Sequence, residues 1–137
     1  MERPPAHAGL RHLALNVRHL EAMKHFYVDL FGFAVEWEPD ADNVYLSSGI
    51  DNLALHRSQA ELPPPSMPSS LDHLGVIVRR AEDVDAWAAF LEGQGVVVEA
   101  RPRTHRDGAR SCYVRDPDGN AVQIIHHPPI SGKFSGA

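Results

Sequence analysis

Large aliphatic residues occupy every second position at the start of each half of the chain. This alternation covers residues 12–17 and recurs over residues 73–78. A period of two is typical of a strand that buries one face. Each half is therefore predicted to open with a strand that turns large aliphatic residues to one face and a histidine to the other. The aliphatic positions are Leu13, Leu15, Val17, Leu74, Val76 and Val78, and the histidines are His12 and His73.

A helical pattern follows each of these strands. Apolar residues then recur every three or four positions, and glycines end both runs. The spacing predicts one helix from Leu20 to Leu30, closed by Gly32, and a second from Ala81 to Leu91, closed by Gly93 and Gly95. Either Phe26 or Tyr27 is expected to face the core of the first half.

Three short strands complete each half. In the first half they are predicted at residues 34–38, 43–47 and 52–57, with a turn at 48–51. In the second half they are predicted at residues 96–100, 110–115 and 120–126, with the turn Asp-Pro-Asp-Gly at 116–119.

The chain thus repeats one pattern, with His73 lying 61 positions after His12. The order βαβββ-βαβββ predicts an α+β fold of two tandem modules. Their curled four-stranded sheets are expected to enclose a shared cavity. We predict one domain over residues 1–137, with module 1 at 9–58 and module 2 at 71–127. A proline-rich linker at 59–70 joins the modules, and residues 128–137 form a loose tail.

Composition narrows the classes of function. The net charge of −5 offers no basic surplus for phosphates, so neither a nucleic acid nor an anionic membrane surface is expected as a partner. The single cysteine, Cys112, cannot form an internal disulfide. With no signal-peptide pattern and no long apolar run, the chain is predicted to be cytoplasmic.

Alternation also predicts which polar residues face the cavity. His12 and His73 do so on the opening strands. On the last strands Leu53, Leu55, Val122 and Ile124 would pack on the helices, which leaves His56 and Gln123 facing inward. Pseudo-twofold pairing of the modules would bring together a candidate metal set of His12, His56, His73 and Gln123.

Two segments resemble the vicinal-oxygen-chelate (glyoxalase/bleomycin-resistance protein/dioxygenase) superfamily. They are residues 12–33 and residues 111–124, which hold the sequence DPDGN with Gln123 three positions later. The resemblance implies a divalent metal bound by two ligands from each module, at positions 12, 56, 73 and 123. It also implies a homodimer that acts on a small-molecule substrate.

The last ligand position departs from the superfamily, which usually has glutamate where this chain has Gln123. Three imidazoles and an amide suit zinc, nickel, cobalt or iron(II) better than calcium or magnesium. Because an amide cannot act as a base, proton abstraction would fall to His56 or to a group that the sequence does not identify. Tyr113, predicted on the inner face of the seventh strand, could either donate a hydrogen bond to a bound oxyanion or support the core as a buried residue.

Three functions remain open. The first is a metal-dependent, glyoxalase-like isomerase or lyase that chelates two adjacent substrate oxygens. The second is a metal-free protein that binds a small molecule such as an antibiotic, and the third is an extradiol-type ring-cleaving dioxygenase.

Basic residues cluster before the seventh strand. Arg101, Arg103, His105, Arg106 and Arg110 form either a clamp for an anionic substrate or a solvated loop. The other histidines, His126 among them, are predicted to lie at the surface or at a chain end.

Overall fold

The computed structural model describes residues 1–133. The chain forms two compact units, Met1–Leu62 and Pro63–Ala137. The division falls inside the predicted linker at 59–70. Residues 134–137, the end of the predicted tail, lie outside the described residues. Each unit contains one βαβββ module, and the two are described in turn.

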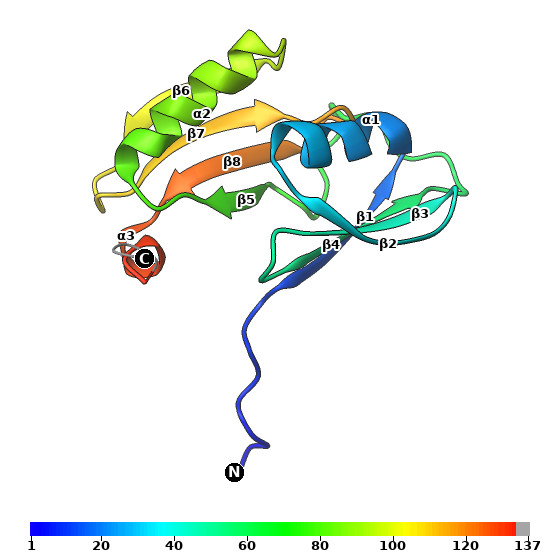
Figure 1. Ribbon diagram of the computed structural model, residues 1–137, viewed down its shortest axis with the longest axis horizontal. Helices are drawn as coiled ribbons and strands as arrows, with labels where there is room; N and C mark the ends of the chain where they lie inside the picture. Colours follow the sequence, from blue (N-terminus) through cyan, green and yellow to red (C-terminus); the bar gives the residue numbers. More distant parts are fainter. Residues whose placement is uncertain (134–137) are drawn as a thin grey trace. The chain divides into compact units, whose positions relative to one another are not determined.

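Module 1 is a mixed four-stranded sheet with a helical segment against it (Figure 1). The strands lie in the order β1-β4-β3-β2, with β1 parallel to β4 and the other pairs antiparallel. The elements are β1 His12–Val17, α1 Leu20–His25, η1 Phe26–Leu30, β2 Ala34–Asp40, β3 Asn43–Ser47 and β4 Asn52–Arg57.

Module 2 repeats this topology in the order β5-β8-β7-β6, with β5 parallel to β8. Helix α2 lies across β6, β7 and β8 (Figure 1). The elements are β5 Leu74–Ile77, α2 Ala81–Gly93, β6 Val98–Thr104, β7 Arg110–Arg115, β8 Ala121–His126 and α3 Pro128–Ser131. The predicted α+β fold of two βαβββ modules is confirmed, and neither sheet closes into a barrel.

Both candidate aromatic residues of the first helix face the core of module 1. After α1 the chain widens into the π-helical turn η1, in which the Phe31 amide donates to the Phe26 carbonyl at 3.2 Å. A π turn holds more residues than an α turn, so two neighbouring side chains can point the same way. Phe26 is therefore 3% exposed and Tyr27 is fully buried, with their rings packed edge to face at 4.9 Å.

No helix within residues 1–133 is long and apolar enough to cross a membrane.

The sixth strand begins later and runs further than predicted. The amides of Gly95 and Val96 still bond to the end of α2, so β6 starts only at Val98. It then continues through Pro102 to Thr104. Proline is tolerated because β6 is an edge strand, where an amide can lack a partner. Arg101 and Arg103 consequently lie on a strand and not on the predicted loop.

The first part of the predicted loose tail is folded. Pro128–Ser131 form the short helix α3, and Ser131 is fully buried. The Ser131 hydroxyl donates to the Val78 carbonyl at 2.8 Å and accepts the His127 amide at 3.0 Å. These bonds fasten the tail to module 2 and end β8, which sequence alternation alone could not indicate.

The Asp-Pro-Asp-Gly turn is built around the buried Asp116 carboxylate, whose Oδ1 accepts the amides of Asp118 and Asn120. Gly119 closes the turn with a φ of 88°. A Cβ added at Gly119 would lie 2.5 Å from the Cβ of Pro65, so the linker packs directly on this turn.

Replacing Gly119 with alanine is therefore expected to lower the free energy of unfolding by about 1 to 3 kcal/mol, through its left-handed backbone and the contact with Pro65. Gly93→Ala is the matched control, because a Cβ there meets nothing within 4 Å. Urea unfolding of both variants tests this. Equal stability of Gly119→Ala and the wild type would contradict the described turn.

Candidate functional site

His12 is held on module 1 by a chain of side-chain hydrogen bonds. Its Nδ1 lies 2.8 Å from Asn52 Oδ1, and Asn52 Nδ2 donates to Glu36 Oε1 at 3.2 Å. Asn52 is the partner of His12 in the parallel β1/β4 register. Because an amide oxygen can only accept, His12 carries its proton on Nδ1 in this arrangement.

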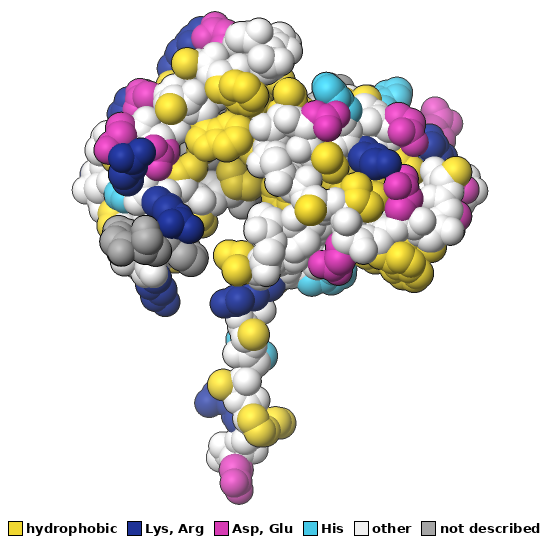
Figure 2. Space-filling view, viewed as in Figure 1, with side chains coloured by type: hydrophobic (Ala, Val, Ile, Leu, Met, Phe, Trp, Pro, Cys, Tyr) yellow, Lys and Arg dark blue, Asp and Glu magenta, His cyan; other side chains and the backbone are white. Residues whose placement is uncertain are grey.

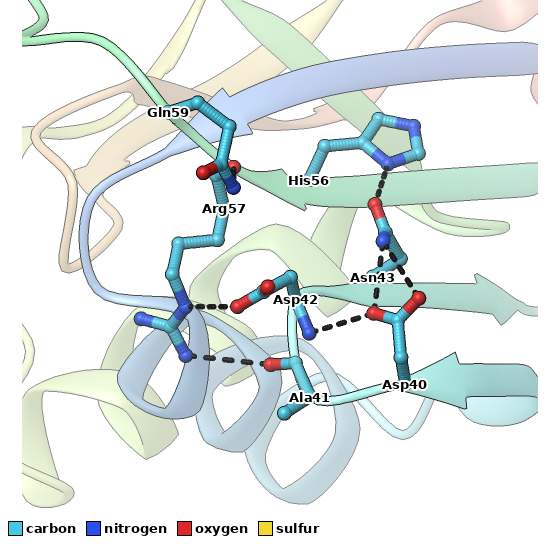
Figure 3. A network of polar contacts seen from close by, with 7 residues as sticks. All are labelled: Asp40, Ala41, Asp42, Asn43, His56, Arg57 and Gln59. Atoms are coloured by element: carbon cyan, nitrogen blue, oxygen red, sulfur yellow. Dashed lines mark hydrogen bonds and ion pairs between the residues drawn. The ribbon is translucent and has the colours of Figure 1, made fainter.

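His56 is held in the same manner at the β2/β3 hairpin (Figure 3). Its Nδ1 lies 2.6 Å from Asn43 Oδ1, and Asn43 Nδ2 donates to both oxygens of the Asp40 carboxylate. Hydrogen bonds from the Asp42 amide, the larger cause, and from the Asn43 side chain lower the pKa of Asp40 from its ordinary value. The row of hydrogen bonds from His56 therefore ends on a carboxylate. The His56 ring also packs edge to face against Tyr45, with centroids 5.6 Å apart.

Module 2 places His73, Tyr113 and Gln123 together. His73 Nδ1 lies 2.6 Å from Asp72 Oδ1, and its ring packs edge to face against Tyr113 at 5.4 Å between centroids. Tyr113 is the cross-strand partner of Gln123 on β8. Gly75, the partner of Gln123 on β5, has no side chain, and a Cβ there would lie 3.8 Å from Gln123 Oε1.

All three histidines thus bond through Nδ1 to an oxygen acceptor. Their Nε2 atoms have no hydrogen-bond partner within residues 1–133. An acceptor on Nδ1 fixes the tautomer in which the Nε2 lone pair can bind a metal ion. The acceptors Asn43, Asn52 and Asp72 were missed at the sequence level. Asn52 could have been found, because it is the parallel-strand neighbour of His12.

The register separates His56 from His12. Asn16, not His12, is the partner of His56, so the two histidines lie four residues apart along neighbouring strands. At 3.3 Å per residue this offset is about 13 Å, too long for both side chains to reach one ion. In module 2, the partner of Gln123 is Gly75, which lies only two residues after His73.

The position in module 1 that corresponds to Gln123 is Ala54. Ala14 pairs with Ala54, as Gly75 pairs with Gln123, and Ala14 precedes Gly75 by the repeat distance. The sequence carries this signal, since Leu53 and Leu55 flank Ala54 as Val122 and Ile124 flank Gln123. No group of three or more His, Cys, Asp or Glu side chains suited to a metal ion occurs among the described residues.

An open cleft of about 760 Å³ lies on module 2 beside Gln123. The segment between β6 and β7 lines it, together with β8 and His127. Its lining residues are Arg103, Thr104, His105, Arg106, Asp107, Ala109, Gln123, Ile125 and His127. The predicted basic cluster is split by this arrangement, because Arg101 pairs with Glu92 and Arg110 pairs with Asp85, and neither lines the cleft.

Cys112 lies in the core and not at the site. Its side chain is fully buried, and burial, assisted by the charge of Asp85, raises the pKa of the thiol to about 11. A thiol with this pKa stays protonated at neutral pH, which excludes it as a nucleophile.

The family model described as Glyoxalase/Bleomycin resistance protein/Dioxygenase superfamily matches residues 9–124. The chain belongs to this superfamily. The match spans both modules, includes positions 12, 56, 73 and 123, and ends within β8 just after Gln123.

Individual relatives agree with this membership. "Virulence protein STM3117" of Salmonella typhimurium is 28% identical over 121 residues, which cover 85% of this chain and 82% of that protein. The solved lactoylglutathione lyase of Agrobacterium tumefaciens is 25% identical with a TM-score of 0.72, covering 98% of this chain and all of that one. A glyoxalase family protein of Enterococcus faecalis is 30% identical, with a TM-score of 0.72 and coverages of 87% and 98%.

The environment of Cys112 predicts slow reaction with Ellman's reagent in the native protein at pH 8, and fast reaction in denaturant. A thiol pKa raised above 9.0 also contributes stability that is fully present below pH 9 and is lost as the pH rises through about 11. Thermal unfolding at pH 8 to 11 should therefore show a smaller alkaline loss in Cys112→Ala. Fast native labelling would contradict the buried position.

Proposed function

We propose that this chain is a metal-dependent, glyoxalase-like enzyme of the isomerase or lyase type, acting on a small substrate with two adjacent oxygens. The observation that carries the proposal is the shared state of the imidazoles of His12, His56 and His73, each with Nδ1 bonded and with no hydrogen-bond partner on Nε2 among residues 1–133. The relative named lactoylglutathione lyase supports this reaction class. We further propose a homodimer, in line with the superfamily resemblance, and a cytoplasmic location, in line with the single cysteine Cys112.

The residues that would hold the metal are His12, His73 and Gln123. Their donor atoms, two imidazole nitrogens and an amide oxygen, fit zinc, nickel, cobalt or iron(II). The acceptors on His12 and His73 are the partners that metal-binding histidines commonly have. Such an ion would act as a Lewis acid on the substrate oxygens. Ala54 supplies no fourth donor, and three protein ligands with an open position are typical of catalytic sites.

His56 is the proton acceptor in this proposal. Gln123 cannot accept a proton, and the Nε2 atoms of the other two site histidines would be used as ligands. His56 keeps a free Nε2, and Asn43 and Asp40 fix its ring. Its distance from His12 along the sheet favours a role toward the substrate over a place among the metal ligands. Tyr113, beside His73 and Gln123, would donate a hydrogen bond from its hydroxyl to the developing oxyanion.

A metal-free binding protein is the second candidate. It is favoured by the uncharged residues Ala54 and Gln123 at the two matching positions of the last strands. It is also favoured by the 59% exposed Trp37, which stacks on Tyr45 with centroids 5.1 Å apart. Such a stack offers a flat apolar surface for a ring-containing ligand.

Metal analysis of tagless protein purified without chelator separates the two candidates. We expect about one equivalent of a transition metal per chain, and its loss in His73→Ala with an unchanged Tm. His25→Ala is the matched control, because His25 also bonds to an aspartate through Nδ1 but lies on α1. Less than a tenth of an equivalent after incubation with zinc, nickel and iron(II) would favour the metal-free candidate.

The role of His56 predicts an effect on turnover without an effect on metal content. With the metal-loaded protein and hemithioacetals of α-ketoaldehydes, His56→Ala should lower kcat by about 100-fold or more. Asn43→Ala, which frees the ring, should lower kcat less. Gln59→Ala, an exposed change nearby, is the control. A His56→Ala variant that loses its metal would instead make His56 a ligand.

A further inference from the structure

The arginines of the module 2 cleft differ from most arginines of that module. Arg80, Arg101, Arg110 and Arg115 each pair with a carboxylate, and on the face drawn in Figure 2 basic and acidic side chains of this module lie side by side. Arg103 and Arg106 line the cleft and have no carboxylate partner within residues 1–133. Their positive charge is therefore not neutralised by a side chain of the described module.

A chain of hydrogen bonds orders one side of this cleft. Arg103 Nη2 donates to His105 Nδ1 at 3.1 Å, and in this arrangement the Nε2–H of His105 points to Ser111 Oγ at 2.9 Å. Ser111 is only 2% exposed and lies on β7, which makes it a rigid anchor. His105 is thus not the free surface residue that the sequence predicts but a support that positions the Arg103 guanidinium.

Asp107, the acidic residue of the cleft lining, accepts a hydrogen bond within its own loop. Asp107 Oδ1 accepts the amide of Ala109 at 3.0 Å, and this bond closes the turn between β6 and β7. The remaining polar groups of the lining include the Gln123 amide and the His127 ring. The cleft accordingly offers guanidinium N–H donors in the same lining as Gln123, the proposed metal ligand.

We propose that this cleft binds an oxyanion group, carboxylate or phosphate, of the substrate through Arg103 and Arg106. This inference rests on the proposed function, because Gln123 belongs to both the cleft and the proposed metal set. Guanidinium groups present paired donors that match the oxygens of either anion, and a preordered guanidinium loses less entropy on binding. The volume of about 760 Å³ is within the range of small-molecule sites. The substrate class is thus a small oxygenated acid or phosphoester.

The test uses full-length, chelator-treated protein and two probes, inorganic phosphate and acetate, at constant ionic strength. Amide NMR spectra should show saturable shifts at residues 103–109 and 123, with a dissociation constant on the order of 1 mM for at least one probe. The double variant Arg103→Gln/Arg106→Gln should bind at least about tenfold more weakly. Arg79→Gln, which removes an arginine outside the cleft lining, should bind like the wild type.

The two probes distinguish the sources of the anion, since the one that saturates at lower concentration names the group. Shifts without saturation, or equal weakening by Arg79→Gln, would overturn the proposal, because both indicate only diffuse attraction. Omitting metal keeps this outcome separate from the proposed enzyme function. Loss of anion binding in a metal-binding protein would refute the cleft alone, whereas anion binding in a protein that takes up no metal would refute the metal centre alone.

Discussion

Parallel pairing of the first and last strands in each module, β1 with β4 and β5 with β8, determines how the candidate ligands at these strands lie relative to one another within a module. Side chains on paired strands share a face only when they are offset by an even number of residues. They come close only when that offset is small. His73 and Gln123 satisfy both conditions. His12 and His56 satisfy the first but not the second, which is why the two modules, alike in topology, differ in the groups they can bring together.

The fold could be predicted from the sequence because inner strands such as β3 and β8 bury every second residue and helix α2 carries a regular apolar stripe. The bounds of β1, β3, β4 and β7 match the predicted ranges. The differences arise where another interaction competes with alternation. The end of α2 takes the amide of Val96 and delays β6, and the π turn at Phe26–Leu30 turns two neighbouring aromatic residues inward.

The candidate site could be predicted only in part. Alternation along a strand shows which residues share a face, but it does not show their hydrogen-bond partners. His12, His73 and Gln123 follow from alternation and the repeat. The acceptors Asn43 and Asp72 depend on a hairpin and on a side-chain rotamer, and neither leaves a periodic signal. The basic cluster shows the same difficulty. Arg101 and Arg110 are neutralised by carboxylates on α2, whereas Arg103 is held by a histidine, and only the folded chain separates these cases.

Two of the four edge strands, β2 and β6, share a further property. Each has seven residues, contains one proline, Pro39 or Pro102, and is interrupted by two register shifts against its neighbour. An open sheet normally exposes a row of unpaired amides on which strands of other molecules can assemble. Here a missing amide and an irregular backbone make the edges formed by β2 and β6 poor templates. Two open sheets can therefore coexist in one small chain without inviting fibrillar aggregation along these edges.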